Sequence, residues 1–141
     1  MILLDTNILS EIMRPTPDQA VEAWIGQQPP ASLFISTITE AELRYGAALM
    51  PKGRRRDAVS AAIEGMITED FHGRILAFDS TATNFYAVIA ANRRTSGRPI
   101  TPFDAQIAAI ARSRGATLAT RNVADFEGCG IEIVNPWSVH P

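Results

Sequence analysis

The stretch Met1-Ile-Leu-Leu-Asp-Thr-Asn7 decides the fold, because a short apolar run ends in a carboxylate that a helical segment follows. Residues 2–4 predict a buried strand, and Asp5 stands directly after its carboxyl end. A helix is expected from about residue 7 to 13, where Arg14 and Pro15 stop it. This strand–acid–helix order is the first unit of a pattern that continues along the chain.

Strands and helices alternate through the rest of the sequence. Short apolar runs predict further strands over residues 33–35, 74–78, 117–120 and 131–134. Helices are expected from residue 17 to the prolines at 29–30, from 37 to the break at 51–53, and over 54–70, 80–95 and 103–114. This alternation indicates an α/β protein: a three-layer α/β/α fold around a short, mainly parallel sheet. With no repeat or linker in sight, residues 1–141 are expected to form one domain.

Composition excludes several classes of protein. The 141 residues are 46% hydrophobic and 20% charged, which is typical of a globular chain rather than a disordered one. No apolar run approaches the roughly 20 residues of a membrane helix, and the N-terminus does not resemble a signal peptide. The single cysteine, Cys129, allows no internal disulfide, so a cytoplasmic protein without membrane contact is expected.

The basic residues limit the chemistry further. Lys52 is the only lysine among 13 basic residues, and the chain has neither a phosphate-binding loop with its lysine nor a dinucleotide-binding glycine motif. The two histidines, His72 and His140, are too few and too scattered for a histidine-rich metal site. The net charge of −2 by itself does not indicate a nucleic-acid partner.

Acidic residues follow the predicted strands at the edge where parallel sheets bind ligands. Asp5 follows the first strand, and Asp125 follows the strand over 117–120, while Glu42 and Asp104 stand early in helices that begin on the same side. Four carboxylates converging without a lysine need a cation. Hard oxygen ligands with open positions suit Mg²⁺ or Mn²⁺.

Glu42 is the sharpest of these candidates. It completes an apolar stripe at helical spacing, which places it on the expected core face of its helix: Ile38, Ala41, Tyr45, Ala48 and Leu49. A buried carboxylate is costly unless it is paired, so the structural alternative is an ion pair with Arg44 or Arg74. Glu40, in contrast, fits a capping box that Thr37 begins.

The other candidates also have structural alternatives. Asp5 could cap the first helix, and Asp104 could complete a capping box with Thr101. Asn122 could cap a short turn over residues 123–126. Only their joint position at one sheet edge favours a functional interpretation.

Four segments in order resemble the motifs of PIN-domain ribonucleases, in particular the VapC toxins of type II toxin–antitoxin pairs and their FitB-like branch. These segments are Met1–Asn7, Ser36–Leu43, Pro102–Ala109 and Ala119–Phe126. The ending Asn135-Pro-Trp137 fits that branch as well. The resemblance implies a Rossmann-like α/β/α fold, a homodimer, and RNA cleavage that depends on Mg²⁺ or Mn²⁺.

The resemblance also implies the site residues. Asp5, Glu42 and Asp104 match the three most regular acids of the family. Asp125 is our choice for the fourth ligand, although many relatives carry that acid at the position of Asn122. The expected supporting residues are Thr6, Asn7, Thr120 and Asn122.

RNA must reach this acidic site, and arginines at its rim are the candidate phosphate contacts. Arg121, next to the site, is the one we favour. The other candidates each have a solvated helix face as the structural alternative, which is preferred for most of them: Arg54, Arg55, Arg56, Arg93, Arg94, Arg98, Arg112 and Arg114. The sequence does not name the RNA, which in relatives is tRNA or rRNA.

The resemblance further implies a VapB-like antitoxin. We expect its tail in an apolar groove beside the third and fourth helices, near Tyr45, Leu49 and Val59, with an arginine directed at the acids. DNA would be met only through the antitoxin. A homodimer is expected from apolar residues on two other helices: Val21, Trp24 and Ile25, and Phe85, Tyr86 and Ile89.

Two alternative functions are weaker. A metal-dependent phosphatase or phospho-acceptor domain would need a second aspartate where Asn7 stands, or a lysine after Lys52. A catalytically inactive subunit that binds RNA or antitoxin would not need all four acids.

Overall fold

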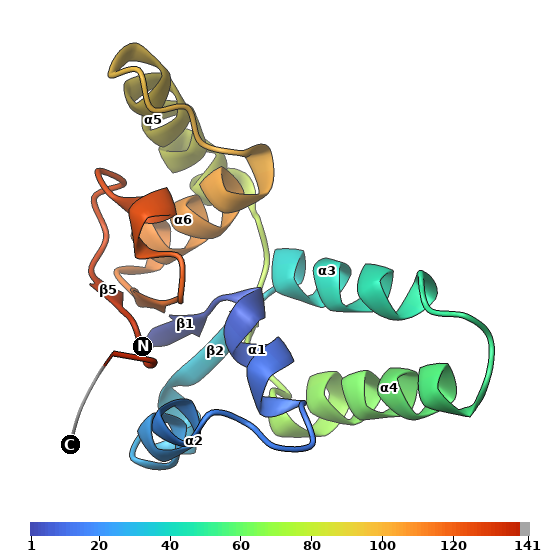
Figure 1. Cartoon of the computed structure of the whole chain (residues 1–141). Helices are drawn as coiled ribbons and strands as arrows, with labels where there is room; N and C mark the ends of the chain where they lie inside the picture. Colours follow the sequence, from blue (N-terminus) through green and yellow to red (C-terminus); the bar gives the residue numbers. More distant parts are fainter. Residues whose placement is uncertain (139–141) are drawn as a thin grey trace.

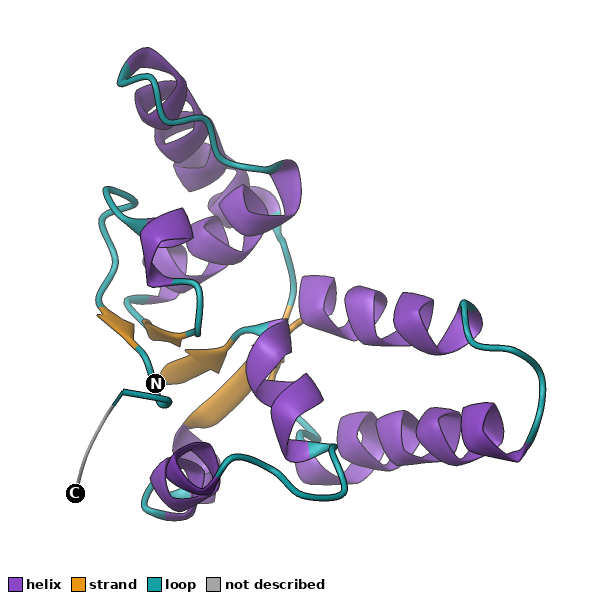
Figure 2. Ribbon diagram, in the orientation of Figure 1, coloured by secondary structure: helices purple, strands orange, loops and turns teal. Residues whose placement is uncertain are grey.

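Five parallel strands form the centre of the computed structural model, which describes residues 1–138 (Figures 1 and 2). The strands are β1 (Ile2–Leu4), β2 (Leu33–Ser36), β3 (Ile75–Leu76), β4 (Thr117–Ala119) and β5 (Ile133–Val134). Their order across the sheet is β3-β2-β1-β4-β5. The helices in this range are α1 (Thr6–Ile12), α2 (Gln19–Gly26), α3 (Thr37–Ala48), α4 (Arg54–Gly65), α5 (Ser80–Thr95) and α6 (Pro102–Arg114). The expected three-layer α/β/α fold is confirmed, with every strand pairing parallel.

Alternation along the strands builds two hydrophobic cores, one on each face of the sheet. Leu3 and Leu118 pack with α5 and α6, whereas Leu4 and Ala119 pack with the helices α1 to α4. Successive side chains of a strand point to opposite faces, so each short strand serves both cores. This double burial explains why the strands read as continuous apolar runs.

Helices α3 and α4 pack side by side as a hairpin that extends away from the sheet (Figure 1). A wider π-helical turn, Met66–Asp70, continues α4 and brings Met66 and Ile67 into the core. The expected single helix over 54–70 is therefore split at Gly65. One side of α3 faces α1 and α4, while Ile38 near its start packs against the core that contains α6.

The order in which successive strands are added to the sheet reverses at β1. The chain passes from β1 to β2 and β3 on one side, and β4 and β5 lie on the other side. Ligands bind at such a switch point, outside the carboxyl ends of the strands. Asp5 follows β1 and Thr120 follows β4, so the topology brings these two residues to that point.

Several expected boundaries were wrong. The strands expected over 74–78 and 131–134 each comprise two residues in the structure, although the carbonyls of Arg74 and Glu132 accept from the amides of Ile35 and Leu118 in the neighbouring strands. Helix α3 is capped by Ser36, whose hydroxyl accepts from the Thr39 amide at 3.1 Å, rather than by Thr37. Asp18 caps α2, so this helix begins two residues after Pro17.

The hydrophobic surface expected to form a dimer is only partly exposed: Ile25, Phe85 and Tyr86 are half-buried. Val21, Trp24 and Ile89 are buried in the cores and offer no surface for a second chain. The large exposed hydrophobic residues are Met1, Tyr45, Leu49, Val88 and Phe103. Within residues 1–138, no helix combines the length and the apolar character needed to cross a membrane.

Candidate active site

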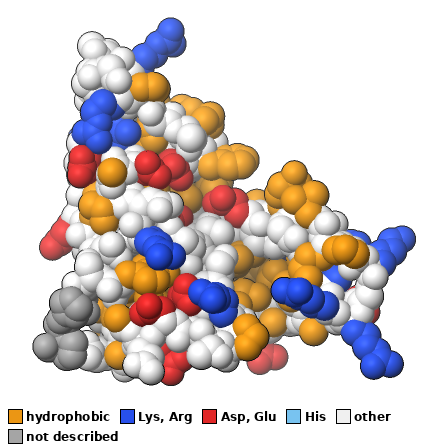
Figure 3. Space-filling view, in the orientation of Figure 1, with side chains coloured by type: hydrophobic (Ala, Val, Ile, Leu, Met, Phe, Trp, Pro, Cys, Tyr) orange, Lys and Arg blue, Asp and Glu red, His pale blue; other side chains and the backbone are white. Residues whose placement is uncertain are grey.

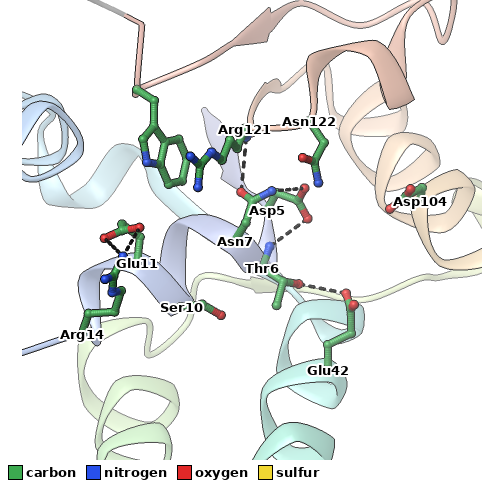
Figure 4. Close-up of a pocket in the computed structure, with 11 residues that line it drawn as sticks. Asp5, Thr6, Asn7, Ser10, Glu11, Arg14, Glu42, Asp104, Arg121 and Asn122 are labelled. Carbon is green, nitrogen blue, oxygen red and sulfur yellow. Dashed lines mark hydrogen bonds and ion pairs between the residues drawn. The ribbon is translucent and has the colours of Figure 1, made fainter. Parts of the chain in front are cut away.

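A cavity of about 450 Å³ opens at the switch point of the sheet (Figure 4). Residues from α1, α3, α6 and the segments after β1, β4 and β5 line it: Asp5, Thr6, Asn7, Ser10, Glu11, Arg14, Glu42, Asp104, Arg121, Asn122 and Trp137. Three of the four acids picked out by the sequence thus share one cavity. Asp5 and Asp104, the first and last of the three, are 99 positions apart in the sequence, so only the fold brings them together.

Asp5 is held at the floor of this cavity by hydrogen bonds. Its carboxylate accepts from the Thr6 amide at 2.8 Å, which confirms that it caps α1, and from the Thr120 hydroxyl at 2.7 Å. The side-chain amide of Asn7 donates to Oδ2 of Asp5 at 3.4 Å. Burial raises the pKa of Asp5 from 3.8 to about 6, and the carboxylates of Asp104 and Glu42 add to this rise. The fold therefore holds Asp5 where its negative charge is poorly compensated by the protein.

Glu42 is half-buried on α3. The apolar stripe that the sequence analysis used to predict this burial is not the buried face of the helix. The buried face of α3 carries Thr39, Leu43 and Ala47, whereas Tyr45 and Leu49 of the expected stripe are exposed. The Thr6 hydroxyl donates to Oε1 of Glu42 at 2.8 Å (Figure 4). Glu42 thus faces the cavity from the boundary between the buried and exposed sides of its helix.

The structural alternative for Glu42 is contradicted among the described residues. Arg44 pairs with Glu40 and Glu64 instead. Arg74 donates to backbone carbonyl groups, including that of Pro30 at 2.7 Å. Glu40 forms an ion pair with Arg44 across one helical turn. The capping box expected between Thr37 and Glu40 is wrong, because Ser36 and not Thr37 caps α3.

Asp104 lies in the first turn of α6 and is half-buried. Thr101 caps this helix, and its hydroxyl accepts from the Asp104 amide at 3.3 Å, as the capping alternative anticipated. Because this cap bond uses the backbone amide of Asp104, the Asp104 side chain still lines the cavity. Burial raises the pKa of Asp104, and the nearby Asp125 carboxylate raises it further, while Arg93 opposes the shift.

Asp125 and Asn122 differ in their position. Asp125 is exposed and close enough to influence Asp104, yet it does not line the cavity. Asn122 does line the cavity, and its amide donates to the Thr120 hydroxyl at 3.1 Å rather than capping the next turn with its side chain. The identity of a fourth ligand stays a prediction, with Asn122 better placed than Asp125.

The sequence did not single out Ser10, Glu11, Arg14 or Trp137, although all four line the cavity. Glu11 is buried and accepts from Arg14 at 3.2 Å and from the Asp18 amide at 3.0 Å. The i,i+3 spacing of Glu11 and Arg14 was the available signal for this pair. Trp137 gave no signal beyond its place in the family-like ending, because its partner is distant in sequence.

The candidate arginines separate clearly. Arg121 lines the cavity. Arg93 is buried, donating to the carbonyls of Arg98, Asp125 and Glu127, so its role is structural. The Arg98 side chain pairs with Glu127 at 3.1 Å.

The cavity has the charge and the donor atoms that suit a divalent cation. Four carboxylates line it against two guanidinium groups, and one of those, Arg14, is already paired with Glu11. Mg²⁺ and Mn²⁺ take oxygen ligands, and Mg²⁺ keeps several waters in protein sites, which suits carboxylates spread around a cavity. Within residues 1–138, no three acidic, histidine or cysteine side chains gather tightly enough to surround one ion by themselves. The residues therefore fit a partly hydrated ion rather than a closed cage.

A second hollow adjoins the first between α1, α3 and α4 and measures about 490 Å³. Figure 3 shows hydrophobic atoms in this hollow, with basic side chains at its rim. Met13, Leu43, Met50, Val59 and Ile63 contribute its apolar lining, and we call it the α3–α4 groove. Val59 lies in it as expected, but Tyr45 and Leu49 do not: Tyr45 lines a different hollow with Ile38 and Phe103, and Leu49 is exposed. Thr6, Ser10, Arg14 and Glu42 line both hollows, so the groove leads into the acidic cavity.

Comparison with known proteins agrees with this fold. The model of the PIN domain matches residues 2–127. The chain belongs to the PIN-domain family, in the group that contains the VapC and FitB toxins. The resemblance inferred from the four sequence segments is thereby confirmed.

The individual relatives match over nearly their whole length. VapC ribonuclease Y4jK of Sinorhizobium fredii is 45% identical over 137 residues, covering 97% of this chain and 98% of that protein. Toxin FitB of Neisseria gonorrhoeae is 39% identical over 137 residues, covering 97% and 99%. The solved structure of FitAB bound to an IR36 DNA fragment contains a chain with a TM-score of 0.94 and 38% identity, covering 100% of this chain and 99% of that one.

Proposed function

We propose that this protein is a Mg²⁺- or Mn²⁺-dependent endoribonuclease that acts as the toxin of a type II toxin–antitoxin module. The observation that carries the proposal is the meeting of Asp5, Glu42 and Asp104 in one cavity at the switch point of a parallel sheet. The relatives named as ribonuclease and toxin support it, because they match nearly the whole chain.

In this proposal, Asp5, Glu42 and Asp104 hold the cation, with Asn122 or Asp125 as the fourth group. A bound divalent ion lowers the pKa of water and polarises a phosphoryl oxygen, which is what phosphodiester hydrolysis needs. The hydroxyls of Thr6 and Thr120 fix the carboxylates of Glu42 and Asp5. One carboxylate accepts the proton of the attacking water, so no side-chain nucleophile is required.

The α3–α4 groove is the proposed seat of the antitoxin tail. Its apolar lining suits the apolar face of a partner helix, and its open end shares Glu42 with the acidic cavity. An arginine of the tail would reach the carboxylates and form charge-assisted hydrogen bonds there. The solved FitAB complex contains DNA, which supports the expectation that DNA is met through the antitoxin.

A homodimer is also proposed, but through a different surface from the one first expected. The exposed aromatic rings of Tyr45 and Phe103 line a cavity of about 460 Å³ with Ile38 and Ala41, between α3 and α6. Covering such apolar surface favours association. Light scattering at micromolar concentration tests this, with Tyr45→Glu as the variant expected to give monomers.

The decisive experiment on activity has two arms. Mapping the 5′ ends of RNA from cells that express the protein would identify the cleaved RNA, with tRNA and rRNA as the expected classes. The purified protein should then cut that RNA with Mg²⁺ or Mn²⁺ and lose this activity in EDTA. Cleavage of phosphomonoesters but not RNA would favour a phosphatase instead. Absence of any cation binding by calorimetry would favour an inactive binding subunit.

A further inference from the structure

We propose that Trp137 is a positioning residue for RNA binding, because its indole ring holds the guanidinium group of Arg121 ready for a phosphate. The inference rests on the proposed ribonuclease function and adds a residue to it. It gives the segment after the last strand a part in the site.

The geometry of the pair is that of a cation–π stack. Cζ of Arg121 lies 5.0 Å from the centroid of the Trp137 ring, within the range of this interaction. Both residues line the acidic cavity. Figure 4 shows Arg121 at this cavity, with Asp5 nearby. A stacked guanidinium group keeps its N–H edges free to bind a phosphate oxygen pair.

Arg121 differs from the other arginine of the cavity in having an uncommitted charge. Arg14 is paired with the buried Glu11. Among residues 1–138, the Arg121 side chain has neither an ion pair nor a hydrogen bond, and only its backbone amide is engaged, by Asn7 Oδ1 at 3.3 Å. Its five N–H groups therefore remain available to a ligand.

The stack also accounts for how Arg121 stays apart from the acids. A mobile guanidinium group beside carboxylates tends to form bidentate pairs with them. Such a pair with Asp5 would occupy the oxygens that the proposed cation needs and would remove the positive charge that RNA needs. Stacking on Trp137 favours a position of Arg121 on the wall, in which neither function is lost.

The fold places Trp137 firmly enough for this task. Strand β5 pairs with β4, and the Thr120 amide donates to the Val134 carbonyl at 2.9 Å, directly before Arg121. The chain then turns at Asn135, whose side chain accepts from the Trp137 amide at 3.0 Å. The indole ring packs in part against the core on the α1 side of the sheet. Both members of the stack are thus anchored to neighbouring strands.

The test measures RNA binding rather than cleavage. Each variant is made in the full chain carrying Asp5→Asn, and a fluorescein-labelled 20-nucleotide single-stranded RNA is titrated by anisotropy at several salt concentrations. Arg121→Gln should weaken binding about tenfold, since a charge-assisted contact is lost. It should also reduce the slope of log affinity against log salt by about 0.7, the value for one phosphate contact on a single strand.

Trp137→Leu should weaken binding about two- to fivefold, in line with the strength of an exposed cation–π contact. It should lower the salt slope in the same direction as Arg121→Gln. Trp137→Phe, which keeps an aromatic face, should restore most of the affinity. In the double variant Arg121→Gln/Trp137→Leu, the loss should equal that of Arg121→Gln alone, because Trp137 acts through Arg121.

Additive losses in the double variant, with an unchanged salt slope for Trp137→Leu, would overturn the inference and indicate that the indole stacks on a base directly. Thermal unfolding checks that the variants are folded. Should Trp137→Leu not fold, Arg121→Lys decides, because it keeps the charge without the planar stack. Parental binding by Arg121→Lys would contradict the proposal. Failure of the unmodified protein to cut any RNA, and of the Asp5→Asn chain to bind any, would instead overturn the proposed function itself.

Discussion

The Thr6 hydroxyl donates a 2.8 Å hydrogen bond to Oε1 of Glu42 and so ties the first turn of α1 to the middle of α3. The same hydroxyl lies 3.0 Å from that of Thr39, which is fully buried. Glu42 is therefore aimed at the cavity by a neighbour of Asp5 rather than by a basic partner. This contact is also at the junction of the acidic cavity and the α3–α4 groove.

Thr6→Val should lower RNA cleavage about tenfold, which corresponds to about 1.4 kcal/mol of lost transition-state stabilisation, because Glu42 is released from its position. Thr6→Ser retains the hydroxyl and should stay near the parental rate. The measurement is single-turnover cleavage of the identified RNA at saturating Mg²⁺. Equal rates for the valine and serine variants would show that Glu42 needs no such support.

Asp5→Asn, Glu42→Gln and Asp104→Asn should each abolish RNA cleavage while the protein remains folded. Each change preserves the shape of the side chain and removes one negative charge from the cavity. Asp125→Asn is the matched control, since Asp125 is exposed and outside the cavity, and a smaller effect is expected. Circular dichroism checks folding. Parental cleavage by Asp104→Asn would show that this residue only belongs to a helix cap.

The stability of the cation-free protein should depend on pH through Asp5. Burial raises the pKa of Asp5 to about 6, above its value of 3.8 in the unfolded chain. The folded state therefore holds this proton more tightly, and Asp5 makes the protein more stable as the pH falls from about 7 to about 4. The contribution is up to about 3 kcal/mol.

Urea unfolding in EDTA at pH 4.5 and 7.5 measures this effect. The parent should gain stability at the lower pH relative to Asp5→Asn, whose side chain does not titrate. Added Mg²⁺ should stabilise the parent more at pH 7.5 than at pH 4.5, because ligands bind cations in their ionised form. An identical pH dependence for parent and variant would contradict the assigned environment of Asp5.

Gly46→Phe should block antitoxin binding without loss of RNA cleavage. Gly46 lies on α3 and lines the groove, and a Cβ atom added there meets nothing within 4 Å, so a side chain can leave the helix at this position. The phenyl ring would occupy the space proposed for the antitoxin tail. Gly46→Ala is the matched control and should bind antitoxin normally while gaining about 0.5–1 kcal/mol of stability.

Co-purification with the product of the neighbouring reading frame measures that binding. Full inhibition of Gly46→Phe by the antitoxin would place the tail elsewhere. The same complex tests the arginine of the tail: inhibition that survives its replacement by alanine would contradict the proposed contact with the acids.

The sequence by itself determined the order of strands and helices, because short apolar runs and helical segments alternate along it. It also determined that Asp5 stands at a strand end, since a carboxylate cannot continue a run buried on both faces. Thr101 was recognisable as a cap because capping acts within three residues. Local interactions of this kind are encoded by neighbouring residues and can be read directly.

Only the tertiary structure decided which side of α3 is buried. The apolar stripe through Tyr45 and Leu49 predicted a core face, yet these side chains are exposed and Thr39 is buried. The helix packs against α1 and α4, so its inner face is set by those neighbours rather than by its own pattern. Distant partners also decided the polar contacts of this helix: Arg44 forms an ion pair with Glu64, and Glu42 accepts a hydrogen bond from Thr6.

The residues that line the cavity show most clearly what the sequence alone could not predict. Arg121 and Trp137 are 16 residues apart, and Glu11 and Asp104 are 93 apart, yet all four line one cavity. No local spacing encodes such a meeting, because it follows from the parallel pairing of β1, β4 and β5. The sequence could name the acids by their place after strands, whereas their partners depend on which strands become neighbours in the sheet.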